Sequence, residues 1–210
     1  SGALVGWLRS ARHRALGDGV RVVLVHALNP HGFAWLRRVN EDNVDLNRNF
    51  VDHDGDYPID PDYAALHPFL LPETWDEASS AAFDEAWSRI QTERGQFAAQ
   101  AILSRGQYHF SDGVFFGGNA PTWSNQTFRN IVDRFVRGAP HVAFIDFHTG
   151  LGPYGTAELI HREPAGTPAR QRLDSWYRHG LTSLPDGTTS SAASPDGLVE
   201  AALVRSLAES

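Results

Sequence analysis

"VRVVLVHALNP", residues 20–30, is the stretch that most directly indicates the fold of this 210-residue chain. It is an almost continuous apolar run rich in β-branched residues, which is typical of a strand buried on both faces of an α/β sheet. "HVAFIDF", residues 141–147, has the same character, and "TAELIHR", residues 156–162, predicts a third strand. The sequence therefore predicts a sheet built from these runs.

Helical patterns separate and flank the three runs. They cover residues 3–16, most of 60–105 with breaks at Pro68 and Pro72, 123–137, 167–179 and 198–210. The helix at 123–137 has the clearest limits, since Ser124 or Asn125 can cap its start and Gly138 can stop it. Alternation of strands and helices predicts a three-layer α/β/α domain with a central mixed sheet. Because no strand follows the last helix, we expect this domain to be incomplete.

Composition limits the class of protein. With 41% hydrophobic and 20% charged residues the chain is globular, and its length suits a single domain over residues 1–210. A net charge of −7, with only 18 Lys and Arg, argues against a nucleic-acid partner. No apolar run reaches the roughly 18 residues of a membrane span, so we expect no membrane partner.

The ends of the sequence bear on its compartment. The N-terminus lacks the basic and apolar regions of a signal peptide, which favours the cytoplasm and leaves the compartment open. The chain begins with Ser1 and contains no Met. We therefore expect the gene product to start upstream.

The absence of cysteine restricts any metal site to His, Asp and Glu ligands. His148 directly follows the second predicted strand, where it can serve as a ligand or as a hydrogen-bonded core histidine. His53 with Asp56, and His109 with Asp112, have the separation of a short metal-binding motif. They lie in turn-rich loops, so we regard them as weaker candidates.

Polar side chains follow the first two predicted strands. In open α/β sheets ligands bind at the carboxyl ends of strands, so these loops are expected to share a pocket. An Arg guanidinium can hold a carboxylate through two parallel hydrogen bonds, and an Asn amide can add a third, which favours a carboxylate-bearing substrate. "LNRN", residues 46–49, is also compatible with turn formation and surface charge. The candidates are His26, Arg37, Arg38, Asn47, Arg48 and His148.

Four motifs in fixed order resemble the zinc carboxypeptidase family, in its branch close to the aspartoacylase and succinylglutamate desuccinylase enzymes. They are "NPHGF" (29–33), "RR" (37–38), "VDLNRNF" (44–50) and "DFHTGLGPYG" (146–155). "GGNAPTWSN" (117–125) resembles a signature of an uncharacterised bacterial branch. The resemblance runs from residue 1 to about residue 200. It implies zinc-dependent hydrolysis of an amide bond next to a free carboxylate, in a peptide or an acyl amino acid.

The resemblance also implies roles for the residues that bind substrate. Asn47 and Arg48 match the pair that binds the terminal carboxylate of the substrate. Arg38 matches the catalytic Arg that stabilises the oxyanion of the tetrahedral intermediate. Arg37 is adjacent to Arg38, so this assignment can shift by one residue.

The metal-binding residues implied by the resemblance are incomplete in this sequence. His148 matches the third zinc ligand, and Asp45 matches a carboxylate that orients a zinc-bound histidine. The other two ligands of the family form a His-x-x-Glu motif, which is absent here and is expected upstream of Ser1. The catalytic Glu is expected at or beyond Ser210. We therefore expect this chain alone to bind zinc poorly and to be inactive.

Other functions stay open at this stage. The substrate-binding residues also suit an N-acyl amino acid deacylase of the aspartoacylase type. A non-catalytic domain that binds peptide C-termini through Asn47 and Arg48 would need no zinc. A degenerate homologue would have lost the zinc site and kept only carboxylate recognition. A serine hydrolase of the α/β type is excluded, because no Gly-x-Ser-x-Gly elbow is present.

Overall fold

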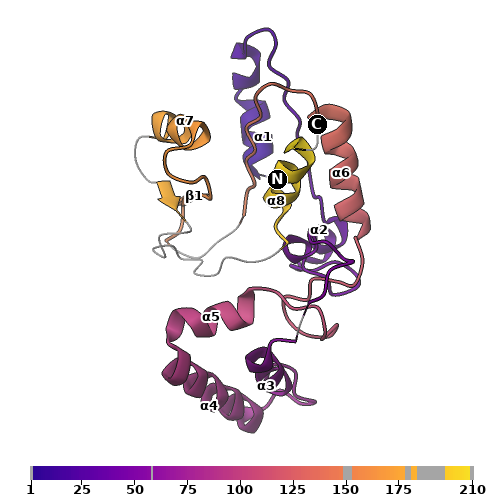
Figure 1. Cartoon of the computed structure of the whole chain (residues 1–210), viewed down its shortest axis with the longest axis vertical. Coiled ribbons are helices and arrows are strands. Elements are labelled where there is room, and N and C mark those ends of the chain that lie inside the picture. The colour runs from indigo at the N-terminus through magenta and orange to yellow at the C-terminus, as the bar shows by residue number, and fades with distance from the viewer. Residues whose placement is uncertain (1, 58, 149–152, 178–180, 184–196, 209–210) are drawn as a thin grey trace. The chain divides into compact units, whose positions relative to one another are not determined.

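The computed structural model divides the chain into two compact units (Figure 1). It describes residues 2–57, 59–148, 153–177, 181–183 and 197–208. Unit 1 comprises Ser1–Pro58, Gln107–His148 and Asp196–Ser210, and unit 2 comprises Ile59–Gly106 and Thr149–Pro195. The interpretation of residues 1–210 as a single domain stays a prediction.

Unit 1 is built around two helices that pack together, α6 and α8. Its core consists of Phe50, Phe128, Val132, Val199, Ala202 and Leu203. The rings of Phe50 and Phe128 meet edge to face with centroids 5.5 Å apart, so the segment before Val51 is fixed directly to α6. The elements of unit 1 are α1 (Gly2–Arg9), η1 (Arg12–Ala15), α2 (Pro30–Trp35), η2 (Leu46–Arg48), α6 (Trp123–Phe135) and α8 (Val199–Ala208).

The sequence predicted α6 closely but not its cap. The side chain of Thr122 accepts a hydrogen bond from the backbone N–H of Asn125 at 3.2 Å, so Thr122 is the N-cap. Ser124 and Asn125, the predicted caps, are buried inside the first turn. The chain leaves the helix before Gly138, whose φ of +78° suits a residue without a Cβ.

Unit 2 contains the predicted helical stretch as α3 (Pro61–Leu70), α4 (Glu77–Arg94) and α5 (Gln96–Ser104). A small core of Leu66, Ala86, Ile90 and Ala99 holds these helices together. The predicted break at Pro68 is wrong, since this residue lies inside α3. The helix ends at Leu70, two residues before Pro72.

The same unit contains a short parallel pair of strands, β1 (Leu159–His161) and β2 (Leu181–Ser183), with Leu159 opposite Leu181. Helix α7 (Pro168–Trp176) lies between them in sequence and is capped by Thr167. The predicted strand at 156–162 and the helix at 167–179 are therefore both present in shortened form. This pair is the one sheet of the described residues.

The prediction of a three-layer α/β/α fold with a central mixed sheet is wrong. Over the residues that it describes, the structure is mostly helical, with 49% helix and 4% strand. A strand needs a neighbour to pair with its backbone N–H and C=O groups, and an apolar sequence supplies none. Among the described residues, 21–25 and 140–147 make no hydrogen bond through their backbone. The two runs that predicted the sheet are therefore irregular in this structure.

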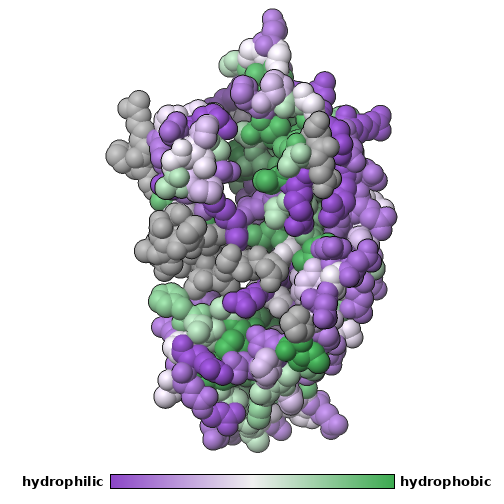
Figure 2. Space-filling view, in the orientation of Figure 1, coloured by the Kyte–Doolittle hydropathy of each residue, from purple (hydrophilic) through white to green (hydrophobic). Residues whose placement is uncertain are grey.

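The same two runs leave apolar side chains on the surface of unit 1. Val20, Ile145 and Phe147 are more than half exposed. Figure 2 shows hydrophobic atoms in a hollow of this unit, in the area where Figure 1 places α1 and α8. In the described part of the chain, no helix combines the length and the apolar character needed to cross a bilayer.

Candidate functional site

The candidate site is centred on residues 44–50 in unit 1, and apolar residues fix this segment to the protein. Val44 and Phe50 are buried, and Leu46 packs against the core of the unit. The carboxylate of Asp45 accepts a hydrogen bond from the backbone N–H of Asn47 at 3.0 Å and so caps the short helix η2. The polar side chains between the apolar residues are therefore held in defined directions.

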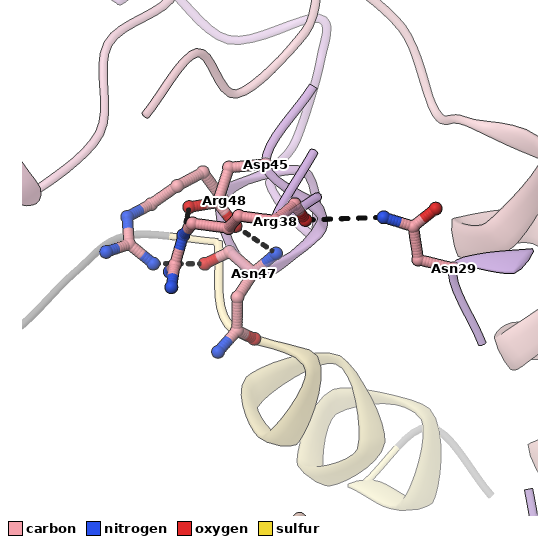
Figure 3. Close-up of polar contacts among 5 residues, drawn as sticks. All are labelled: Asn29, Arg38, Asp45, Asn47 and Arg48. Carbon is pink, nitrogen blue, oxygen red and sulfur yellow. Dashed lines mark hydrogen bonds and ion pairs between the residues drawn. The ribbon is translucent and has the colours of Figure 1, made fainter. Parts of the chain in front are cut away.

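Asn29 of the "NPHGF" motif connects two parts of the site. Its side chain accepts from the backbone N–H of Gly32 at 2.9 Å, which caps α2. Its Nδ2 group donates to the backbone carbonyl of Arg38 at 3.3 Å, as Figure 3 shows. A Cβ at Gly32 would collide with this amide and with the carbonyl of Arg37, so the motif requires glycine there.

Arg38 contacts Asp45 directly. Its Nε donates to Oδ2 of Asp45 at 2.7 Å, and Asp45 is almost fully buried while the side chain of Arg38 is 54% exposed. A charge-assisted hydrogen bond of this length fixes the guanidinium on one side. The side chain of the adjacent Arg37 makes no hydrogen bond or ion pair among the described residues. Of the two arginines, Arg38 is the one that the structure places in the site.

Arg48 lies beside Arg38, and both contact the ring of Phe115. The guanidinium carbons lie 5.0 Å (Arg38) and 5.2 Å (Arg48) from the ring centroid, within the range of a cation–π interaction. Arg48 is 5% exposed, and its Nη1 donates to the backbone carbonyl of Asn47 at 2.9 Å. Two positive groups from different segments therefore share one aromatic ring.

Asn47 turns toward the C-terminal helix (Figure 3). Its Oδ1 accepts a hydrogen bond from the backbone N–H of Val199 at 3.1 Å, at the first residue of α8. Its Nδ2 group makes no hydrogen bond among the described residues. Asn47 thus joins the site to α8 through one atom and keeps a donor for another partner.

A buried asparagine network supports the site from behind. The Nδ2 of Asn49 donates to the carbonyls of Gly117 (2.8 Å) and Ala120 (2.9 Å). Its Oδ1 accepts from the backbone N–H of Thr122 at 2.9 Å and from Nδ2 of Asn125 at 3.1 Å. Both asparagines are fully buried. The network fixes the "GGNAPTW" loop to the "LNRN" segment.

The backbone carbonyl of Arg48 is contacted by two other segments. The hydroxyl of Tyr108 donates to the carbonyl of Arg48 at 2.9 Å. Gly197 packs against the same carbonyl, and its own carbonyl accepts from the N–H of Phe50 at 3.1 Å. A Cβ at Gly197 would overlap Arg48, so close packing at this place requires glycine.

His148 lies near these charges at the end of the second apolar run. Its Nε2 is 2.7 Å from Oδ2 of Asp146, and this hydrogen bond raises the pKa of His148 above its usual value of 6.5. Arg38 lowers and Asp45 raises the same pKa through their charges, so the imidazole lies within electrostatic reach of that pair.

The residues at this place do not fit a zinc site by themselves. A catalytic zinc takes three protein ligands, usually His, Glu or Asp in a cysteine-free chain. Nowhere in the described parts of the chain do three or more His, Cys, Asp or Glu residues come together in a possible metal site. Asp45 binds Arg38 rather than a histidine, and Asp146 binds His148. The predicted role of Asp45 toward a zinc-bound histidine therefore stays a prediction.

The remaining candidate histidines contact an aromatic ring or backbone carbonyls. The ring of His26 meets the ring of Phe33 edge to face with centroids 5.0 Å apart. The Nε2 of His53 lies 2.9 Å from the carbonyl oxygen of Asn49, and Nε2 of His109 contacts the carbonyl of Tyr57. His26 thus packs on α2, His53 contacts the site segment four residues before it, and His109 joins two loops.

One family model, described as a protein of unknown function (DUF2817), matches residues 1–210. The chain belongs to the DUF2817 family. No curated protein and no solved structure matches the sequence. Membership of DUF2817 names no reaction.

Three residues of the DUF2817 chain were missed as parts of the site: Phe115, Asn49 and Asn125. The sequence did contain a signal for Asn49, since this residue belongs to the "LNRN" tetrapeptide and lies two positions after Asn47. Asn125 ends the "GGNAPTWSN" signature, where the sequence favoured a helix cap. Phe115 carried no signal, because only the folded loop brings its ring to the two arginines.

Proposed function

We propose that this DUF2817 chain recognises the free carboxylate of a peptide or an acyl amino acid, as part of a zinc-dependent hydrolase of the carboxypeptidase type. The observation that carries the proposal is the pair of guanidinium groups, of Arg38 and Arg48, on the ring of Phe115. Asn47 lies next to Arg48 with an amide donor directed to no described residue. The carboxylate-binding roles of Asn47 and Arg48 come from the sequence resemblance.

The chemistry of such a substrate suits two neighbouring cationic groups. In an acylated α-amino acid the amide carbonyl and the carboxylate are joined through one nitrogen and one carbon. Arg48, which is mostly buried, would pair with the permanent charge of the carboxylate, where a low local dielectric strengthens the interaction. Arg38, which is more exposed and tied to Asp45 through Nε alone, would meet the negative charge that develops on the amide oxygen.

The proposed zinc dependence rests on the sequence resemblance. When bound, zinc would activate water and polarise the scissile carbonyl. His148 is the proposed ligand in this chain, and the described residues bring only Asp146 to it. The resemblance alone supports two further ligands.

A second candidate is a non-catalytic domain that binds peptide C-termini. Such a domain needs no metal-binding cluster, and none is found among the described residues. It shares the carboxylate-binding residues Asn47 and Arg48 with the enzyme. An N-acyl amino acid deacylase would use the same residues on a smaller substrate.

Binding of a matched pair of probes tests the shared part of these candidates. We expect the chain to bind N-acetylglycine and not N-acetylglycinamide, which has the same shape without the charge, in calorimetric or NMR titrations. Arg48→Ala should weaken binding of the acid about ten- to one-hundred-fold, as expected for a lost charge-assisted pair. Arg137→Ala, which removes an exposed arginine paired with Asp133, is the control and should bind normally. Equal binding of acid and amide would refute carboxylate recognition.

A further inference from the structure

Phe115 is the side chain that joins the two site arginines. Arg38 follows α2 and Arg48 ends η2, and the guanidinium carbons of both lie within 5.2 Å of the Phe115 ring centroid. The face of an aromatic ring carries partial negative charge and attracts a guanidinium at this distance. Like charges on the two arginines would otherwise favour their separation. The ring therefore offsets part of their repulsion.

The backbone conformation of Phe115 is strained for a residue that has a side chain. Its φ of 54° lies in the left-handed region, where a Cβ causes steric strain. Glycine would adopt this backbone freely, as Gly118 does at φ +84° in the same loop. The strain at Phe115 must be offset by contacts of the loop or of the ring itself.

Packing of the ring in a hydrophobic core is not one of these contacts. The neighbouring Phe116 is buried, whereas Phe115 is only half-buried and belongs to neither hydrophobic core. The loop that carries it is fixed on both sides. The N–H of Gln107 donates to the carbonyl of Phe115 at 3.2 Å, and the N–H of Asp45 donates to the carbonyl of Phe116 at 2.8 Å. The ring is thus anchored in front of the arginines.

We propose that Phe115 is a positioning residue for carboxylate recognition, holding the guanidinium groups of Arg38 and Arg48 side by side before the substrate arrives. This inference rests on the proposed function and adds a residue to it. Arginine side chains lose much rotamer freedom when they bind a ligand, and a ring that already orders them reduces this loss. The ordered pair selects one amino-acid unit, whose amide and carboxylate face the two guanidiniums together.

Variants of Phe115 test this role with N-acetylglycine as the probe. Phe115→Leu removes the ring and keeps an apolar side chain, while Phe115→Tyr keeps the ring. Phe135→Leu on α6 is the matched control, because the guanidinium of Arg134 lies 5.1 Å from that ring and away from the site residues. The second readout is the NMR shift of the Nε–Hε groups of Arg38 and Arg48, which an adjacent ring displaces.

We expect Phe115→Leu to weaken binding about ten-fold, as two lost cation–π contacts imply, and to abolish the ring-induced shifts of both arginines. Phe115→Tyr should restore both readouts, and Phe135→Leu should change neither. Wild-type affinity in Phe115→Leu, or no recovery in Phe115→Tyr, would overturn the inference. If Phe115→Leu does not fold, trifluorophenylalanine at position 115 keeps the shape and weakens the negative face. Unchanged affinity would then overturn the inference.

The two proposals fail in different ways. If the wild-type chain does not distinguish N-acetylglycine from its amide, the proposed function is wrong. The arginine Nε–Hε shifts do not depend on any ligand, so they still decide whether Phe115 orders the pair. Shifts that are the same in wild type and Phe115→Leu would contradict the inference even if the acid binds.

Discussion

Residues 44–50 and residues 141–148 contain the two halves of the predicted active site, and the protein holds them very differently. In the first segment Val44, Asp45 and Asn49 are buried, and Asp45 and Asn49 are hydrogen-bonded to the loop at residues 107–122. In the second segment Ile145 and Phe147 are exposed, and no backbone hydrogen bond fixes the described residues 140–147. The side chains of Asp146 and His148 contact one another.

This difference bears on the two proposed roles, recognition of a carboxylate and binding of a metal. A binding group is effective when its position is fixed before the ligand arrives, because ordering then costs little. Asn47, Arg48 and Arg38 meet this condition. His148 does not, since its main contact in the described structure is the exposed pair with Asp146. We infer that the carboxylate half of the site functions without the metal half.

The largest effect should follow from removing Asn49, which supports the first segment. Asn49→Ala deletes five side-chain hydrogen bonds to Gly117, Ala120, Thr122 and Asn125, and leaves buried groups unpaired. We expect it to lower the free energy of unfolding by about 3 kcal/mol or more in urea denaturation. Asp146→Ala in the second segment should cost less than about 0.5 kcal/mol, as an exposed pair implies. Equal losses would show that the two segments are held alike.

A smaller effect should follow from neutralising Asp45. Asp45→Asn keeps an acceptor for the N–H of Asn47 and loses the charge that binds Arg38. Because Asp45 is buried, we expect a loss of about 1 to 2 kcal/mol in the same assay. Asp133→Asn, which breaks the exposed pair with Arg137, is the matched control and should cost at most about 0.5 kcal/mol. If Asp133→Asn lowers the free energy of unfolding as much as Asp45→Asn does, burial does not strengthen the ion pair of Asp45.

The smallest effect concerns the titration of His148. Its hydrogen bond to Asp146 raises the pKa, so Asp146→Asn should lower it in an NMR titration of the imidazole protons. A raised pKa in the folded state stabilises the protein fully below the unfolded value of about 6.5, and this contribution disappears as pH rises through the folded pKa. A pKa of His148 that Asp146→Asn leaves unchanged would mean that the pair is absent in solution.

How far the sequence predicted the fold depended on whether an element is stabilised locally. Helices α4 and α6 were predicted because apolar residues at helical spacing act within one segment. The strands predicted at 20–30 and 141–147 are absent from the described structure, because a strand depends on a neighbour that its own sequence does not contain. The apolar pattern of these two runs is compatible with a strand in a sheet and also with an irregular segment that packs against a helix.

The candidate site shows the same limit. Arg38, Asp45, Asn47 and Arg48 were predicted from sequence order, and the structure brings them together in unit 1. The contact of Asp45 with Arg38 and the shared ring of Phe115 were not predicted. Both depend on contacts between distant segments, which motif spacing does not report. The roles of these residues in a reaction stay predictions.

The most direct measurement is a calorimetric titration of the chain with N-acetylglycine in the presence of a strong zinc chelator. The account predicts that binding and the preference over N-acetylglycinamide persist with unchanged affinity, because the arginine pair is ordered by Asp45 and Phe115 and not by a metal. Loss of binding on chelation, with recovery when zinc is added back, would contradict it. That result would show that the carboxylate half of the site depends on the metal.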